Sequence, residues 1–334
     1  MSNNLNVVVV GSAGYAKELG KQGTTSDFTF YNLKRGESTI TFIEPTKYPD
    51  KLAPLFYASS MADVAIVVIE VLDYTVGECI LMLDCAGVDR GYIVLKNYIS
   101  KDEVAPLFKD TVAQNYEFVE DNTAMLRERL FEYMTHTHVE TTSPEKTEPL
   151  HDYDHSKTGT VSIDHYFNVR GIGTVVLGTV RSGVVRKHEV VKVLPGSKTA
   201  QIRSIQKHDD DFEWASEGDR VGIALKNITV DELDRGFVLT TDESIKCEKI
   251  LTAQAHLVKY WNHALEEGMV LYIGHWMQFV PARVVEIFVE DGDPKAPKLT
   301  IALEKELVHP PGARAVLHHL EGKKLRVIGT MYLE

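Results

Sequence analysis

The sequence predicts a multidomain protein in which one α/β domain is followed by two all-β barrels. Three observations predict this fold class. Strand-like and helix-like stretches alternate over residues 5–133, which is typical of a mostly parallel sheet covered by helices. Residues 136–157 form a polar run with two prolines, and the rest of the chain is rich in β-branched strands and turns. The predicted division is 1–135 for the α/β domain, 136–157 for a linker, and 158–245 and 246–334 for the two barrels.

Hydrophobic periodicity separates two kinds of segment in the first domain. Short apolar runs predict strands at Asn6–Val10, Thr39–Glu44, Val64–Leu72 and Gly91–Leu95. Apolar residues at helical spacing predict helices at Asp50–Ala62, Thr75–Ala86, Lys101–Asp110 and Thr123–Tyr133. This order of strands and helices indicates a mostly parallel sheet.

The barrel region begins with a valine-rich stretch that ends near Val193. Glycines interrupt its strands at positions where turns and bulges are expected, namely Gly171, Gly173, Gly178 and Gly183. Later turns, such as His309-Pro310-Pro311-Gly312, divide further strands. The pattern predicts all-β structure from residue 158 onward.

Composition limits the possible partners. The 334 residues carry a net charge of -12, with 44% hydrophobic and 25% charged residues, as in soluble globular proteins. An RNA contact would therefore need a local basic face, and nothing indicates DNA binding. Without a long apolar run or a signal peptide, we expect a cytoplasmic protein with no membrane partner. The three cysteines lack C-x-x-C spacing and predict reduced thiols, with no zinc site or disulfide: Cys79, Cys85 and Cys247.

Two ordered blocks of sequence carry a resemblance to a known family. The first runs from Asp164-His165-Tyr166-Phe167 through Gly171-Ile172-Gly173-Thr174-Val175-Val176 to Ser182-Gly183. The second comprises residues 217–225 (EGDRVGIAL) and 234–239 (DRGFVL). Together they resemble the second domain of translation elongation factors, most closely the selenocysteine-specific factor SelB and then elongation factor Tu. An unrelated valine-rich barrel is the alternative, because alternating valine and glycine is common.

This resemblance covers nearly the whole chain and implies a P-loop GTPase-like first domain. It also places Glu334 at the end of the family's third domain, without the additional carboxy-terminal domain of SelB. We therefore expect no binding of the structured mRNA element that SelB reads with that domain.

The phosphate-binding loop is incomplete. A P-loop, G-x-x-x-x-G-K-[ST], wraps phosphates with backbone N–H groups, a lysine and a magnesium-binding hydroxyl. In the segment Gly11-Ser12-Ala13-Gly14-Tyr15-Ala16-Lys17-Glu18, alanine replaces the second glycine and glutamate replaces the hydroxyl residue. The remaining candidates for weak nucleotide binding are Gly11, Gly14 and Lys17, and an inherited strand-to-helix turn is the alternative. The resemblance further implies Thr25, in a switch-like segment, as a weak magnesium ligand through the nucleotide.

Two other GTPase motifs have also changed. Positions 44–48, where the family carries D-x-P-G-H, contain Lys47 for the phosphate-sensing glycine and Tyr48 for the histidine that orients water. The guanine-reading N-K-x-D is replaced by residues 96–99, in which Ile99 cannot accept a hydrogen bond and Asn97 remains as a candidate. We expect GTP, GDP and Mg²⁺ to bind weakly, with hydrolysis weak or absent and no confident catalytic residue.

The resemblance places an aminoacyl-tRNA site on the second domain. Asp164 could accept a hydrogen bond from the aminoacyl α-amino group, and Phe167 could pack beside the terminal adenosine. His165 stands where SelB relatives often have arginine, which implies a different or neutral aminoacyl group; an exposed strand histidine is the alternative. A basic set could contact acceptor-stem phosphates or simply be a solvated face: Arg170, Arg181, Arg186, Lys187 and Arg203.

The function predicted first is an elongation-factor-like protein that binds an aminoacyl-tRNA and delivers it to the ribosome, with pyrrolysyl-tRNA as one candidate cargo. The alternative is a non-hydrolysing pseudo-GTPase adaptor that binds the ribosome or other translation partners. Binding of aminoacyl-tRNA in preference to deacylated tRNA distinguishes the two.

Overall fold

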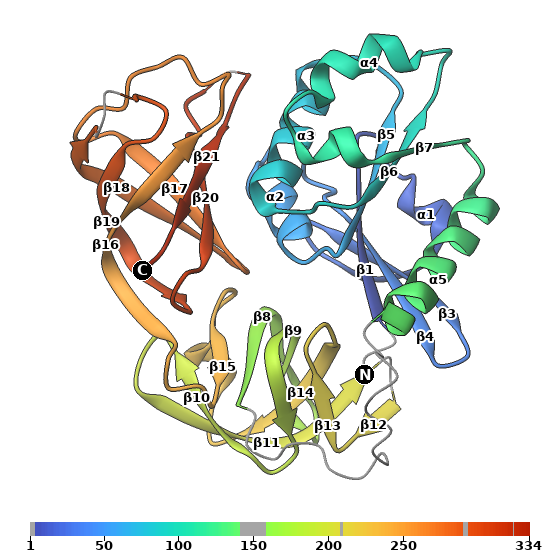
Figure 1. Ribbon diagram of the computed structural model, residues 1–334. Coiled ribbons are helices and arrows are strands. Elements are labelled where there is room, and N and C mark those ends of the chain that lie inside the picture. Colours follow the sequence, from blue (N-terminus) through green and yellow to red (C-terminus); the bar gives the residue numbers. More distant parts are fainter. Residues whose placement is uncertain (1–3, 141–157, 208–209, 290–292, 323) are drawn as a thin grey trace.

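The computed structural model describes residues 4–140, 158–207, 210–289, 293–322 and 324–334, so most of the expected linker, 141–157, lies outside the described residues. It contains an α/β domain and two β-barrels (Figure 1), which confirms the predicted fold class. In Figure 1 the second barrel lies beside the α/β domain, and the first barrel lies below both.

The α/β domain is built on a seven-stranded sheet in the order β2-β3-β4-β1-β5-β6-β7. The five strands from β4 to β7 in this order are parallel, whereas β2 and β3 form an antiparallel hairpin at one edge. The strands are β1 Asn4–Val10, β2 Lys21–Thr25, β3 Thr29–Arg35, β4 Ser38–Glu44, β5 Val64–Ile69, β6 Gly91–Leu95 and β7 Glu117–Val119. The helices are α1 Ala16–Leu19, α2 Ala53–Ser60, α3 Tyr74–Ala86, α4 Lys101–Phe108, α5 Thr123–Glu140 and the 3-10 helix η1 Val112–Asn115.

Strand β1 shows why the sheet is covered on both faces. Its valines alternate between two hydrophobic clusters, with Val8 and Val10 facing α2 and α3, and Val7 and Val9 facing α5. Helix α5 reaches Glu140, five residues beyond the expected end of the first domain at residue 135. No helix among the described residues is both long enough and apolar enough to span a membrane.

The first barrel closes through a ring of pairings, β10-β15-β8-β9-β14-β11, completed by β11 pairing with β10. Its strands are β8 Gly159–Val169, β9 Gly173–Arg186, β10 Val190–Leu194, β11 Lys198–Lys207, β14 Arg220–Lys226 and β15 Val238–Thr240, with the short β12 Asp210–Phe212, β13 Trp214–Ser216 and η2 Val230–Glu232. Gly183 is required in β9 because its φ is +64° and a Cβ would lie 1.6 Å from the Thr158 carbonyl oxygen.

The second barrel is closed in the order β16-β19-β18-β17-β20-β21. Its strands are β16 Lys246–Leu257, β17 Val270–His275, β18 Gln278–Phe288, β19 Lys298–His309, β20 Arg314–His318 and β21 Val327–Tyr332. One end of this barrel packs into the core of the α/β domain, where the Phe56 ring of α2 contacts Phe279 and His318. Met277, Val316 and Val327 belong to the same buried cluster. The α/β domain and the second barrel therefore share one hydrophobic core.

Candidate functional site

The loop after β1 has the backbone of a tight strand-to-helix turn. Gly11 adopts φ +93° and Gly14 adopts φ +84°. A Cβ on Gly11 would lie 2.2 Å from the Val68 carbonyl oxygen, so only glycine fits between the loop and β5. The turn that the sequence predicts at the end of β1 is therefore present.

The Glu44 carboxylate accepts hydrogen bonds from two backbone N–H groups of this loop. Glu44, the last residue of β4, is 5% exposed. Its Oε1 accepts a hydrogen bond from the Gly14 N–H at 2.6 Å, and its Oε2 accepts one from the Ala16 N–H at 3.2 Å. A P-loop offers such N–H groups to phosphate. Here Glu44 takes them and adds a negative charge where the phosphates would bind.

The other candidate nucleotide ligands do not converge on the loop. The Lys17 side chain is exposed. Thr25 is exposed on the edge strand β2, which β3 and β4 separate from β1, and its hydroxyl accepts a hydrogen bond from Gln22 at 3.0 Å. Among the described residues, no group of three or more His, Cys, Asp or Glu side chains is arranged to hold a metal ion. Lys17 and Thr25 are therefore not assembled around the loop in this arrangement.

Tyr48 is half-buried and lines a cavity of about 200 Å³ beside Gly11 and Glu44. Its hydroxyl donates a hydrogen bond to the Thr75 carbonyl oxygen at 2.9 Å. Burial, together with the neighbouring Cys79 and Glu78, raises the pKa of the Tyr48 phenol well above its usual range. A neutral phenol whose proton is already donated to a carbonyl group is poorly placed to orient or deprotonate an attacking water.

The region that would read a nucleobase is tied to its surroundings. Asn97 has a left-handed backbone, with φ +53°, and its Nδ2 donates to the Glu70 carbonyl oxygen at 3.0 Å. Ile99 packs against the core of the α/β domain. Lys96 pairs with Glu70 at 3.1 Å and lies 3.6 Å from Asp121. One of the two amide N–H groups of Asn97 is therefore bonded to the backbone, and the Ile99 side chain has no group that accepts a hydrogen bond from a base.

Asp164 is an internal ion-pair partner. It is 1% exposed and accepts two hydrogen bonds from Arg220, at 2.5 and 2.9 Å, and one from His165 Nδ1 at 2.5 Å. Burial raises the pKa of this carboxyl group, but the charge and hydrogen bonds of Arg220 and His165 outweigh it and hold the pKa far below its usual range. Both oxygens are thus engaged inside the protein, and the α-amino contact expected from the sequence stays a prediction.

His165 lies at the junction of the three parts of the molecule. Its ring meets Phe28 and Phe30 of the α/β domain edge to face, at centroid distances of 5.6 and 6.3 Å. Its Nε2 is buried and finds no hydrogen-bond partner among the described residues. His165 is also one wall of a cavity of about 490 Å³, to which Tyr57 of the α/β domain and Phe279 of the second barrel contribute. The alternative interpretation, an exposed strand histidine, is therefore wrong, since the side chain is 16% exposed.

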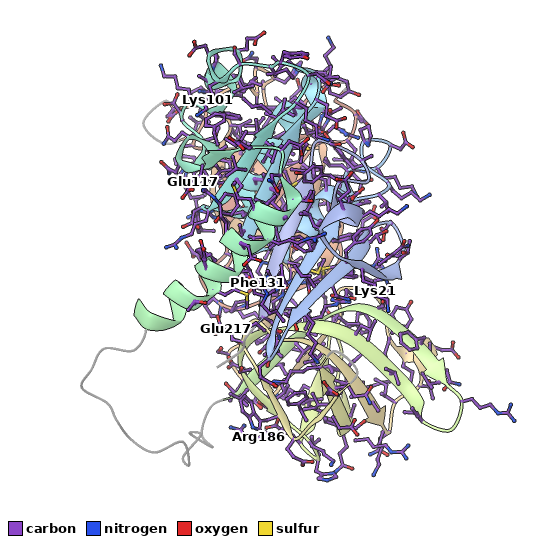
Figure 2. The ribbon with its side chains drawn as sticks, turned by 90° about the vertical axis from the view of Figure 1, so that its right-hand side faces the viewer. Lys21, Lys101, Glu117, Phe131, Arg186 and Glu217 are labelled. Carbon is purple, nitrogen blue, oxygen red and sulfur yellow. The ribbon has the colours of Figure 1, made fainter. Side chains whose placement is uncertain are left out.

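The expected basic set does not form one surface. Arg181 donates to the Ser60 carbonyl oxygen of α2 at 2.9 Å and to Ser162 Oγ at 2.7 Å, so it joins the first barrel to the α/β domain. Burial lowers its pKa to about 10. Figure 2 shows Arg186 at the opposite end of this barrel, away from the α/β domain. Phe167 and Arg170 remain exposed near the turn between β8 and β9.

Three arginines connect the domains in a way that the sequence did not predict. Arg220 lies over the Phe30 ring at 3.7 Å, and Arg235 pairs with Asp27 at 2.8 Å. Arg326 pairs with Glu78, which is 2% exposed, at 2.5 Å. The first two follow an aspartate within the blocks that carry the family resemblance. The position of these two arginines inside the blocks 217–225 and 234–239 was the sequence signal that could have indicated an interdomain contact.

Comparison with known proteins supports the resemblance to translation elongation factors. Residues 173–240 match the model of elongation factor Tu domain 2. The chain is 36% identical to the uncharacterized protein MJ0325 of Methanocaldococcus jannaschii, over 95% of each chain. It is 24% identical to the selenocysteine-specific elongation factor of the same organism, over 82% of this chain but 60% of that protein's length. The crystal structure of translation elongation factor SelB from Methanococcus maripaludis with the GTP analogue GppNHp superposes with a TM-score of 0.79 at 22% identity, covering 99% of this chain and 79% of that chain.

The two matched blocks, the sequence relatives and the shared three-part fold all lead to one conclusion. The chain belongs to the translation elongation factor family that includes SelB and elongation factor Tu.

Proposed function

We propose that this protein binds an aminoacyl-tRNA and presents it to the ribosome in the cytoplasm, without binding or hydrolysing GTP. The observation that carries the proposal is the Glu44 carboxylate in the phosphate-binding loop. GTP would have to displace a buried group that already satisfies the loop N–H groups, and would then meet neither a magnesium ligand nor a base reader. The proposed domains are 1–135, 158–245 and 246–334. The linker proposed at 136–157 connects the first two, and α5 extends into it as far as Glu140.

The cavity beside His165 supports the tRNA part of the proposal. Its walls combine aromatic rings, among them Tyr57 and Phe279, with charged side chains, among them Arg235 and Lys305. An aromatic wall suits a planar or aliphatic group, and the charged side chains beside it can bind the polar groups of an aminoacyl ester. Phe167 and Arg170, exposed on the same barrel, could stack on and pair with the 3′ end.

A non-hydrolysing adaptor for the ribosome or another translation partner is the second candidate. The observation that favours it is Asp164, whose oxygens are already bonded to Arg220 and His165. Without that acceptor, recognition of the α-amino group needs another residue.

The test is sequencing of the RNA that copurifies with the protein, followed by ester-protection assays with the enriched aminoacyl-tRNAs, pyrrolysyl-tRNA included. We expect one class of tRNA to be enriched and its ester bond to be protected. His165→Ala should weaken this protection about tenfold or more, as expected for loss of a buried hydrogen bond and a cavity wall. His263→Ala, which removes an exposed histidine of the second barrel, is the matched control. No enrichment and no protection would favour the adaptor.

A further inference from the structure

The segment Pro45–Pro49, which follows Glu44, lies where the family places its phosphate sensor and the histidine that orients water. Here it is a turn between β4 and α2, with the Tyr48 N–H donating to the Pro45 carbonyl oxygen at 3.1 Å. At its start, Glu44 is bonded to the loop after β1. Each barrel also holds this segment.

The first barrel holds it through Arg235. The Lys47 N–H donates to the Asp27 carbonyl oxygen at 3.0 Å. The Asp27 carboxylate in turn accepts a hydrogen bond from Arg235 Nη1 at 2.8 Å. Arg235 Nε donates to the Asp164 carbonyl oxygen at 3.1 Å, which fixes the guanidinium in its own barrel. Backbone and side chain of Asp27 thus connect the segment to the first barrel.

The second barrel holds the segment through Arg326. Arg326 Nη1 donates to the Pro49 carbonyl oxygen at 3.0 Å. Its Nε and its backbone N–H both donate to Glu78 Oε1 at 3.0 Å, and its Nη2 donates to Oε2 at 2.5 Å. Glu78 is 2% exposed on α3, so this contact is buried and charge-assisted.

We propose that Glu44, Arg235 and Arg326 form an internal clasp that holds the three domains in one arrangement without a nucleotide. Glu44 takes the position of a phosphate in the loop, and the two arginines hold the adjoining segment against both barrels. The segment that should move with the nucleotide state is therefore a fixed structural joint. This inference rests on the proposed nucleotide independence and extends it from the loop to the domain arrangement.

The test is hydrogen exchange of the full chain, read by mass spectrometry on peptides that contain residues 12–19, 45–51 and 230–239. The wild type is measured alone, with GTP and Mg²⁺, and with GDP and Mg²⁺. We expect the three exchange patterns to coincide. Glu44→Gln and Arg326→Gln should each speed exchange in the 45–51 peptide about tenfold or more, because each loses charge-assisted hydrogen bonds. Arg283→Gln is the matched control, since Arg283 bonds the Gly268 carbonyl oxygen within its own barrel.

Two results would overturn the clasp. One is a nucleotide-dependent change in the 45–51 or 230–239 peptides of the wild type. The other is exchange in both clasp variants that matches the Arg283→Gln control. If the variants do not fold, small-angle scattering of the wild type with and without nucleotide decides, because the clasp requires superimposable curves. If either of these two results is found while the protein still binds tRNA, only the clasp is refuted. If the protein does not bind tRNA but its exchange pattern is the same with and without nucleotide, only the proposed cargo is refuted.

Discussion

Replacing Asp164 with asparagine tests whether this residue is structural. The Asp164 side chain is fully buried, and its partner Arg220 is 14% exposed. Asparagine keeps the shape but removes the charge, which leaves the Arg220 guanidinium enclosed over Phe30 without a counter-charge. Breaking a buried pair on one side typically costs about 3–5 kcal/mol. We expect about 3 kcal/mol for Asp164→Asn, because its amide oxygen still accepts one hydrogen bond, and about 4–5 kcal/mol for Asp164→Ala.

The assay is urea unfolding followed by tryptophan fluorescence. Asp210→Asn is the control, since Asp210 forms an exposed pair with Lys34 whose side chains are 66% and 52% exposed. Exposed pairs contribute about 0–1 kcal/mol, so the control should stay within that range. A loss below about 1 kcal/mol for Asp164→Asn would refute the buried-pair reasoning. If the Asp164→Asn variant is folded and as stable as the wild type but no longer binds tRNA, the result would support the role expected from the sequence, in which Asp164 accepts a hydrogen bond from the aminoacyl α-amino group.

Three further predictions concern other sites. Burial lowers the pKa of His275 and His318 to about 3, so below the unfolded-state pKa of about 6.5 the unfolded chain binds more protons than the folded protein. The free energy of unfolding should therefore fall by up to about 1.4 kcal/mol per pH unit for each histidine as the pH drops from about 6 toward 3. Urea unfolding at a series of pH values measures this. A flat profile over that range would contradict it. Gly11→Ala should lower the free energy of unfolding by about 2–3 kcal/mol, because the residue has φ +93° and its Cβ would lie 2.2 Å from the Val68 carbonyl oxygen. The control Gly36→Ala, at φ +57° in open space, should lower it by about 1 kcal/mol. Equal losses of stability in the two variants would contradict the predicted clash. Tyr48→Phe should cost about 1 kcal/mol through the lost hydrogen bond to Thr75. GTP hydrolysis with ribosomes present should be at background in both the wild type and the variant, so wild-type turnover above background that the variant loses would show that Tyr48 is catalytic.

The main elements of the α/β domain could be predicted because their patterns are strong. The valine runs of β1 and β5 are buried on both faces, and α3 begins at the N-cap Asp73 and ends at the left-handed Gly87. The β2-β3 hairpin was missed. Strand β2 is exposed along its whole length and contains Gly23, so it lacks the alternation that marks a strand. Its pairing with β3 decides the structure there.

The candidate site shows a sharper limit. The sequence indicated which nucleotide motifs had changed, because motif spacing is local. It could not show that Glu44 reaches Gly14 and Ala16, since that contact depends on β4 lying beside β1. For the same reason Arg181 looked like a surface cation, although it meets α2 across a domain boundary. Interdomain contacts of this kind have no local pattern.

Binding of aminoacyl-tRNA in the absence of nucleotide tests the central claim most directly. The measurement compares the Kd of an enriched aminoacyl-tRNA with that of its deacylated form, without nucleotide, with GTP and Mg²⁺, and with GDP and Mg²⁺. The account predicts tighter binding of the aminoacylated form and the same Kd under all three conditions. Discrimination that appears only with GTP, or equal binding of the two tRNA forms under every condition, would contradict it.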